Sequence, residues 1–513
     1  MKAKLLVLFF SIIFSNTFGQ ARSQLDINNI LADVYSNGTL FDGVFEVPAG
    51  SFKNTIYLSS FWIGGKDSVG QLHIASQVYG QAGNDIFYGP IAANYSDPTY
   101  IQHDAVYKVN QNVINDHIAY YQNVGYVVPN EISRWPGNGN TSNGEATSLA
   151  PYVDVNQNGT YDPANGDYPM IRGDQAVYFI CNDSRSNHTE SGGAPLGVEF
   201  HGMLYGYNSS DPALHETVFL NLEIYNRSSL NYDSVYFGLF VDMDLGNYND
   251  DYVGYDSVKH VFYTYNANTV DAVYGNVVPT QGCLSLNRIP SKFVYYSNDA
   301  SVQGNPVNAT EYYQYLKGQW RDGSPMTYGG IGYGGSTPTN FMFSGYPENG
   351  IGWTENGVPT FPDDRRGLLS FGPFSFGSQE QICYDFAFPF ANGTGNPLNS
   401  LQNVRTRCTT LQAIYDSCSC DCSFHTGVPQ ISNEVVLKFY PNPSTGKFEV
   451  STQMLALRME DKIQVYSSFG ALVYESSNIQ DHVVIDLNNY ADGIYIAKII
   501  TRDKIFSSKL IKQ

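Results

Sequence analysis

The sequence has few basic residues and few charged residues of any kind. Of 513 residues, 28 are Lys or Arg and 48 are Asp or Glu, which gives a formal net charge of −20. From Ile431 onward nine basic residues balance nine acidic ones, so the acidity lies upstream, where 19 basic residues face 39 acidic ones. An acidic surface repels phosphate backbones. We therefore expect no nucleic-acid partner, and an attraction for divalent cations such as Ca²⁺.

The sequence signatures of common hydrolases are also missing. There is no HExxH and no GxSxG, and the nine His residues are scattered. His201 lies in the run Glu199-Phe-His201-Gly. A lone His of this kind is more often a hydrogen-bonded structural residue than a catalytic one. The sequence favours a non-catalytic protein over an enzyme. The alternative is a secreted glycosidase or peptidase that uses acids such as Asp242 with Asp244 or Glu199.

Long hydrophobic runs are missing beyond the first twenty residues. Residues 1–19 have the pattern of a secretory signal, with two lysines, the apolar run Leu5–Phe14, and small residues Thr17 and Gly19 before the expected cleavage site. The run is too short to span a bilayer as a helix. No Cys follows the signal, so a lipid anchor is not expected, and we expect no transmembrane segment in the mature protein.

No internal repeat is visible and helical stripes are few, whereas Gly is abundant and 14% of the residues are aromatic. Runs of β-branched and aromatic residues between turn residues predict strands, among them Gln175–Asn182, Thr217–Tyr225 and Ser234–Val241. One stretch, Asn399–Tyr415, has apolar residues at steps of three and four and predicts an amphipathic helix on a sheet. The predicted class is mainly β, with a multi-domain β-sandwich passenger and a small Ig-like β-sandwich at the C-terminus.

The predicted domains follow from shifts in composition. After the signal we expect an N-terminal β region at 20–145, which ends in the Gly-rich loop Trp135–Gly144, and a β-sandwich passenger core at 146–417. A Cys-rich linker at 418–432 precedes a C-terminal domain at 433–513. Within the core, the Gly- and Tyr-rich run Tyr328–Gly335 predicts an exposed aromatic surface.

The first candidate calcium site is a loop that begins at Asp154. Oxygen donors fall at positions 1, 3, 5, 7 and 9 of the loop and Gly159 supplies the sharp turn at position 6, as in the front half of an EF-hand loop. Position 12 is Asn165 rather than Glu, and Pro163 argues against a flanking helix. The other interpretation is a pair of Asx turns in a surface loop. The candidate ligands are Asp154, Asn156, Asn158, Thr160, Asp162 and Asp167.

The second candidate site is an acidic stretch from Asp242 to Asp256. It holds five carboxylates in fifteen residues with no Lys or Arg among them, and such like charges repel at short range. A divalent cation would remove that repulsion, whereas the alternative is a solvated loop whose charges point apart. The candidate ligands are Asp242, Asp244, Asp250 and Asp251, and both loops can serve one site if the sheet brings them together.

Seven cysteines are consistent with an exported protein that has some disulfides. Cys418, Cys420 and Cys422, with Cys408, have the spacing of a metal cluster, but an oxidising compartment favours disulfides. Their pairing cannot be deduced from the sequence, and one thiol is left over.

The C-terminal region resembles the type A sorting domain of the type IX secretion system of Bacteroidota. The resemblance is carried by the opening PNPSTGKF after Tyr440, the strand and turn Ile463–Gly470, the run Leu487–Ala497 and a Lys-bearing last strand. It implies that residues 433–513 address the protein to the type IX secretion machinery. The destination is then the cell surface or the medium, beyond both the inner and the outer membrane.

The body, from about Leu25 to Tyr415, resembles a group of large exported Bacteroidota proteins without an established activity. Shared phrases include FWIGG, WPGNG and DDRRGLLSFGPFSF.

The expected function is a calcium-stabilised, non-catalytic protein of adhesion, with a glycan or the extracellular matrix as partner. Exposed Tyr and Trp in Gly-rich loops motivate that expectation, because aromatic faces stack on sugar rings.

Overall fold

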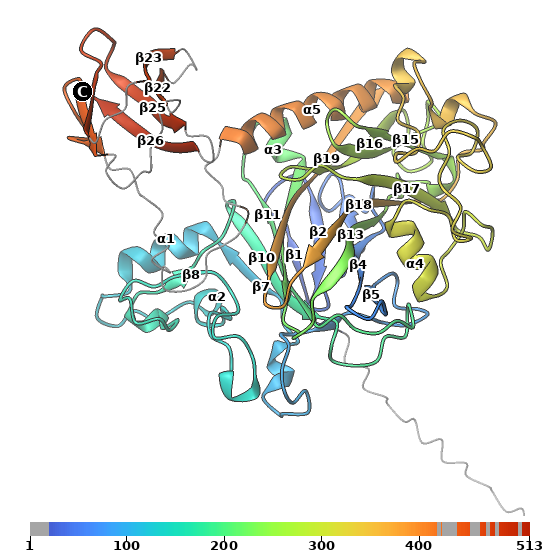
Figure 1. The fold of residues 1–513 in the computed structure, drawn as a ribbon, viewed down its shortest axis with the longest axis horizontal. Helices are drawn as coiled ribbons and strands as arrows, with labels where there is room; N and C mark the ends of the chain where they lie inside the picture. Colours follow the sequence, from blue (N-terminus) through green and yellow to red (C-terminus); the bar gives the residue numbers. More distant parts are fainter. Residues whose placement is uncertain are drawn as a thin grey trace, which may run out of the picture. The chain divides into compact units, whose positions relative to one another are not determined.

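The computed structural model describes residues 20–417, Cys422, 439–451, 462–467, 472–477, 482–500 and 505–513. The predicted signal peptide at 1–19 and all of the predicted linker except Cys422 lie outside the described residues. The chain divides into two compact units, Met1–Val428 and Pro429–Gln513, which we call the passenger and the sorting module. Both are built mainly of strands (Figure 1), as the sequence predicted.

The passenger contains two large antiparallel sheets. The first has the order β1-β2-β3-β4-β13-β18-β17, with β5 beside β4. Its strands are β1 (Arg22–Leu25), β2 (Leu31–Tyr35), β3 (Leu40–Glu46), β4 (Leu58–Lys66), β5 (Leu72–Ser76), β13 (Tyr232–Asp242), β17 (Lys292–Ser297) and β18 (Arg365–Phe376).

The second sheet has the order β14-β15-β16-β19-β12-β11-β10-β6, with β7 beside β10. Its strands are β6 (Phe87–Tyr88), β7 (Tyr107–Asn110), β10 (Gln175–Asn182), β11 (Val198–Gly206), β12 (Thr217–Asn226), β14 (Asp251–Asp256), β15 (Val261–Asn266), β16 (Val277–Ser285) and β19 (Gln381–Thr394). Strands from the predicted N-terminal region thus enter both sheets, and that region forms no sheet of its own.

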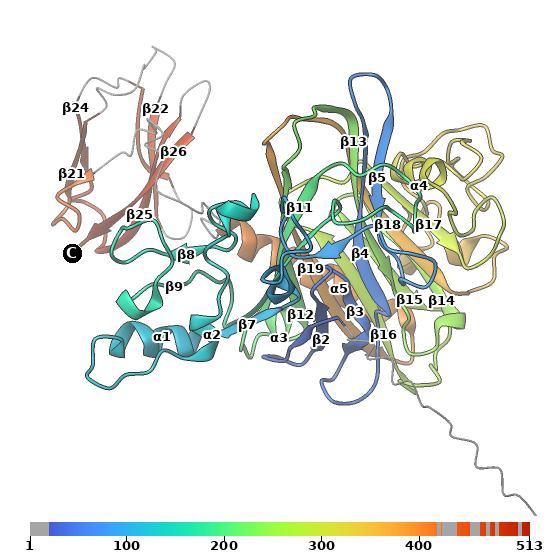
Figure 2. The same ribbon diagram turned by 90° about the horizontal axis from the view of Figure 1, so that it is seen from below.

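The core lies between the two sheets, which Figure 2 shows as adjacent layers. Aromatic rings from the two sheets meet there: Phe61 of β4 stacks on Phe200 of β11 at 5.6 Å, and Phe237 of β13 on Tyr384 of β19 at 4.4 Å between ring centroids. All eight residues of β10 are buried, because its outer face is covered as well. Such strands appear in the sequence as continuous apolar runs rather than alternating ones.

The predicted amphipathic helix is confirmed as α5 (Pro397–Ser417), which packs on β15, β16 and β19 through Leu401, Val404, Cys408 and Leu411. Four shorter helices were not predicted, because their apolar residues are too few or too mixed with Tyr to form an apolar stripe. These are α1 (Gln111–Tyr120), α2 (Asn130–Ser133), α3 (Pro212–His215) and α4 (Ala309–Leu316). No helix among the described residues is long and apolar enough to cross a membrane.

Several short elements complete the passenger. A small hairpin, β8 (Tyr152–Val153) with β9 (Tyr168–Pro169), frames the predicted calcium loop. Single 3₁₀ turns are η1 (Tyr100–His103), η2 (Thr141–Asn143), η3 (Pro163–Asn165), η4 (Tyr248–Asp250), η5 (Pro347–Asn349) and η6 (Glu355–Gly357).

The sorting module consists of two small antiparallel sheets. One has the order β20-β21-β24 and the other β23-β22-β25-β26, with Phe448, Val465, Ile485 and Leu510 among the buried core residues. The strands are β20 (Phe439–Tyr440), β21 (Lys447–Ser451), β22 (Lys462–Ser467), β23 (Leu472–Ser476), β24 (His482–Asp486), β25 (Gly493–Ile500) and β26 (Ile505–Lys512). The predicted small C-terminal β domain is therefore confirmed.

Candidate functional site

Three carboxylates meet at one end of the first sheet. Strand β13 ends at Asp242, which lies opposite Leu58 of β4 on one side and Arg366 of β18 on the other. Asp244 follows two residues later, and Asp364 directly precedes β18. The antiparallel pairing of β13 with β18 thus brings together acids that are 120 residues apart in the sequence.

These carboxylates line a cavity of about 530 Å³, which we call the Asp242 cavity. Its walls come from the ends of β13, β17 and β18, from the segment after β5 and from α4. The lining residues are Tyr57, Val78, Tyr79, Gln81, Ala82, Glu190, Asp242, Asp244, Tyr248, Tyr296, Asn298, Asn305, Pro306, Val307, Tyr312, Asp364 and Arg366.

One ligand oxygen from each of Asp242, Asp244 and Asp364 lies within 4.8 Å of the others. Among the described residues, the Oδ1 atom of each of these acids is buried without a hydrogen-bond partner, and so is Nη1 of Arg366. Asp242 is only 2% exposed and Arg366 only 5% exposed. Buried polar atoms are normally paired, so four such atoms at one cavity indicate a place for a ligand.

Hydrogen bonds hold the second carboxylate oxygens of Asp242 and Asp364. The Tyr79 hydroxyl donates to Asp242 Oδ2 at 2.6 Å and accepts from Nε of Arg366. Nη2 of Arg366 donates to Asp364 Oδ2 at 2.9 Å, and the Asn298 amide donates to the same oxygen at 3.2 Å. Asp242 and Asp364 are therefore each fixed through Oδ2 while Oδ1 stays available.

Burial dominates the electrostatics of the cavity. It raises the pKa of Asp242 to about 7, with the Arg366 charge opposing it. Burial, followed by the charges of Asp242 and Asp364, raises the pKa of Asp244 to about 8. Once ionised, three carboxylates with one guanidinium carry an excess of negative charge, and hard oxygen ligands of this kind suit Ca²⁺. The residues present therefore fit a divalent cation.

The structure places the other acids of the second predicted stretch elsewhere. Asp251 Oδ2 accepts from the backbone N–H of Leu245 at 2.9 Å, and Asp250 accepts from the Asn268 amide at 2.9 Å. Asp256 forms an ion pair with Arg405 of α5. Of the four predicted ligands in this stretch, Asp242 and Asp244 come together in the Asp242 cavity, and Asp250 and Asp251 do not line it.

The first predicted loop is held by its own hydrogen bonds and lies apart from the Asp242 cavity. Asp154 Oδ2 accepts from the N–H of Gly159 at 2.7 Å, and Asp162 accepts from the side-chain amide of Asn158 at 2.8 Å. The buried Asp167 accepts from two backbone N–H groups, those of Val155 and Asp162, at 2.8 and 2.9 Å. The carboxylates of Asp154, Asp162 and Asp167 thus lie within one loop, but the two predicted sites are separate.

Sequence reasoning missed Asp364, Arg366 and Tyr79. Asp364 and Arg366 belong to the run Asp363-Asp364-Arg365-Arg366, which carries charges of both signs and has no spacing typical of a ligand set. Only the pairing of β13 with β18 reveals its role. Glu199, offered as a possible partner of Asp242, lies instead in a buried group with His201 at 2.8 Å and Arg227 at 3.0 Å.

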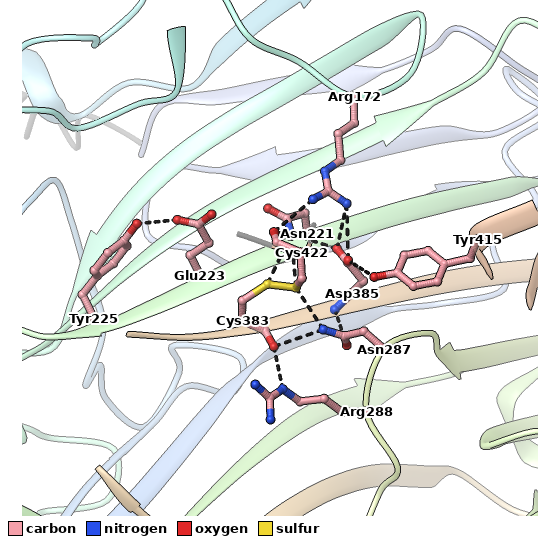
Figure 3. Close-up of a disulfide and its surroundings, with 10 residues drawn as sticks. All are labelled: Arg172, Asn221, Glu223, Tyr225, Asn287, Arg288, Cys383, Asp385, Tyr415 and Cys422. Carbon is pink, nitrogen blue, oxygen red and sulfur yellow. Dashed lines mark hydrogen bonds and ion pairs between the residues drawn. A yellow bond between two sulfur atoms is a disulfide. The ribbon is translucent and has the colours of Figure 1, made fainter. Parts of the chain in front are cut away.

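A second polar group surrounds a disulfide, Cys383–Cys422 (Figure 3). Arg172 and Asn221 each donate to the backbone carbonyl of Cys422, at 3.0 and 2.8 Å, and Asn221 and Arg172 also contact Asp385. This group fixes Cys422, which belongs to the predicted linker, on β12 and β19. The described cysteines Cys181, Cys283 and Cys408 are buried and free, whereas Cys418 and Cys420 lie outside the described residues.

Comparison with known proteins identifies the C-terminal unit. Residues 438–513 match the family model of the secretion system C-terminal sorting domain. The protein is therefore exported by type IX secretion to the cell surface or the extracellular space, and this module serves the interaction with the secretion machinery.

Two lyases show limited similarity to this chain. An ulvan lyase of Nonlabens ulvanivorans is 32% identical over 74 residues, which is 14% of this chain and 13% of that protein. A solved polysaccharide lyase aligns over 61% of this chain and 34% of its own, with 8% identity and a TM-score of 0.18. At that score the likeness supports no conclusion about fold or activity.

Proposed function

We propose that the passenger is a Ca²⁺-dependent glycan-binding protein that acts in adhesion outside the cell, with the Asp242 cavity as its binding site. The convergence of Asp242, Asp244 and Asp364 on one cavity carries this proposal. Ca²⁺ takes carboxylate oxygens as ligands, and a cation between these acids would remove the repulsion of three like charges. In this proposal the unpaired oxygens hold the ion, and Arg366 and Tyr79 position the acids.

Aromatic side chains support a sugar as the ligand. Tyr57 and Tyr248 line the same cavity with 39% and 47% of their surface exposed. Tyr328 and Tyr333, in the predicted aromatic loop, are 50% and 40% exposed and offer further ring surface. Aromatic rings contact the apolar faces of sugars at small cost in conformational entropy, because they have few rotatable bonds.

The Asp154 loop is proposed as a second, structural Ca²⁺ site. Its support is the donor spacing together with three carboxylates, those of Asp154, Asp162 and Asp167, held within one loop. Ion binding there would stabilise the segment between β8 and β9 without touching the glycan.

A secreted glycosidase is the second candidate function. Retaining glycosidases place two carboxyl groups about 5 Å apart across the scissile bond. Ligand oxygens of Asp242 and Asp244 lie within 4.8 Å of each other in a cavity that also offers Arg366 and Tyr79. This alternative uses the same residues for turnover instead of ion binding.

One experiment separates the two candidates. The purified full-length protein is applied to a glycan array with Ca²⁺ and with EDTA, and the bound polymers are then analysed for cleavage. We expect the protein to be retained on a glycan in Ca²⁺ and to leave that polymer uncleaved. EDTA and the Asp244→Asn substitution should each abolish the retention. Metal-independent cleavage that Asp244→Asn abolishes while the fold is kept would establish the glycosidase instead.

A further inference from the structure

The Asp242 cavity contains one unused hydrogen-bond donor beside its unused acceptors. Nε and Nη2 of Arg366 are committed to Tyr79 and Asp364, whereas Nη1 is buried without a partner among the described residues. Leaving a buried guanidinium N–H unpaired is unfavourable, so a bound ligand has to accept a hydrogen bond there. The same ligand lies next to the proposed cation and must also offer it oxygen atoms.

The charge of the cavity decides whether the ligand offers charged or neutral oxygen groups. When all three carboxylates are ionised, they and Arg366 sum to a net charge of −2, and one Ca²⁺ brings the group to neutrality. Glu190 also lines the cavity, where its carboxylate accepts from the Tyr312 hydroxyl at 2.5 Å. No positive charge is left to attract an anion, and a uronate or sulfate group would face additional negative charge at short range.

Neutral hydroxyl groups can both accept the hydrogen bond from Arg366 and offer oxygen to the cation without adding negative charge. A hydroxyl oxygen can coordinate Ca²⁺ through one lone pair and accept a hydrogen bond through the other, while its own proton can go to a carboxylate. Two adjacent hydroxyls on a sugar ring reach one cation together, and the ring's apolar face is then free to contact Tyr57 or Tyr248.

We propose that the ligand of the Asp242 cavity is a neutral saccharide whose vicinal diol completes the coordination of the cation and accepts a hydrogen bond from Nη1 of Arg366. This inference rests on the proposed Ca²⁺-dependent glycan binding and adds the chemical class of the sugar. It excludes acidic polysaccharides as the preferred ligands.

The test uses calorimetry on the full-length protein in a buffer that fixes free Ca²⁺. Ca²⁺ alone is titrated first. Matched oligosaccharides of mannose and mannuronate, glucose and glucuronate, and galactose and galacturonate follow, each before and after periodate cleavage of its vicinal diols. In at least one of these three pairs, we expect the neutral oligosaccharide to bind at least tenfold more tightly than its acidic counterpart. Periodate treatment should abolish the binding of that neutral oligosaccharide.

The variant Arg366→Lys keeps the charge but loses the planar donor. We expect it to weaken sugar binding at least tenfold and Ca²⁺ binding less than threefold. Because Arg366 is buried and its substitution can disturb folding, a second variant, Tyr248→Ala, changes an exposed residue of the cavity. It too should weaken sugar binding at least tenfold and Ca²⁺ binding less than threefold. Tighter binding of the acidic member, periodate-resistant binding, or no Ca²⁺-dependent binding of any neutral member overturns the diol proposal. A failure of Ca²⁺ alone to bind overturns the proposed function itself.

Discussion

Removing one carboxylate from the Asp242 cavity should have opposite effects with and without Ca²⁺. The variant is Asp244→Asn, because Asp244 Oδ1 has no hydrogen-bond partner among the described residues and the substitution changes charge with little change in shape. Ligand oxygens of Asp242 and Asp364 lie within 4.8 Å of it. At an effective dielectric constant near 20, each such pair of charges repels by about 3–4 kcal/mol, before Arg366 and solvent offset most of it.

Without Ca²⁺, the variant should therefore be as stable as the wild type or more stable, by about 1 kcal/mol. With Ca²⁺ at a hundred times its dissociation constant, each wild-type site adds about 2.7 kcal/mol, which the variant loses at this site. The assay is thermal unfolding and calorimetric Ca²⁺ stoichiometry at pH 9. This is above the pKa of about 8 that burial, Asp242 and Asp364 give to Asp244.

The matched control is Asp233→Asn, which makes the same change at an exposed position outside the cavity, on the strand β13 that leads to Asp244. It should keep the full number of Ca²⁺ sites, whereas Asp244→Asn should lose one. The reasoning is refuted if Asp244→Asn lowers the unfolding temperature in EDTA yet binds as many ions as the wild type.

Three further predictions concern other parts of the passenger. Asp154→Ala should remove one Ca²⁺ site in calorimetry and leave Ca²⁺-dependent glycan binding intact; loss of glycan binding would mean that the two sites are linked. Although burial opposes ionisation of Glu199, the hydrogen bond and charge of His201 and the charge of Arg227 lower its pKa to about 2. Because the folded-state pKa is the lower one, this group stabilises the protein above about pH 4.5, and about 3 kcal/mol is lost as the pH falls towards 2. Glu199→Gln should flatten that acid limb in pH-dependent denaturation, and an unchanged limb would contradict the assignment. Cys422→Ser opens a loop of 39 residues and should lower the free energy of unfolding by about 2–4 kcal/mol in urea titrations; no change would show that the hydrogen bonds of Cys422 alone hold the segment.

Local patterns were sufficient to predict the strands and the longest helix. Gln175–Asn182 was predicted with the bounds of β10, and Asn399–Tyr415 lies within α5, because apolar spacing along one element depends only on neighbouring residues. The small C-terminal β domain was also predicted, from its turn residues and alternating strands, and its role in export was predicted from its resemblance to a sorting domain. A β-sandwich was predicted for the passenger, but the strand order of its two sheets was not, since it depends on pairings such as β4 with β13 across some 170 residues.

The candidate site was predicted only in part for the same reason. Asp242 and Asp244 are close in sequence and stood out as unpaired acids, whereas Asp364 and Arg366 reach them through the pairing of β13 with β18. The sequence also grouped Asp250 and Asp251 with them, although a change of sheet after Asp244 places Asp250 in the turn η4 and Asp251 at the start of β14. Proximity along the chain is a weak guide where a strand ends and the next one joins another sheet.

The most direct test of the account is anomalous diffraction from crystals of the protein soaked in Ca²⁺. The account predicts an anomalous peak in the Asp242 cavity with carboxylate oxygens of Asp242, Asp244 and Asp364 about 2.3–2.6 Å away, the usual Ca²⁺–oxygen distance. A cavity without such a peak, in crystals where Ca²⁺ occupies other positions, would contradict it.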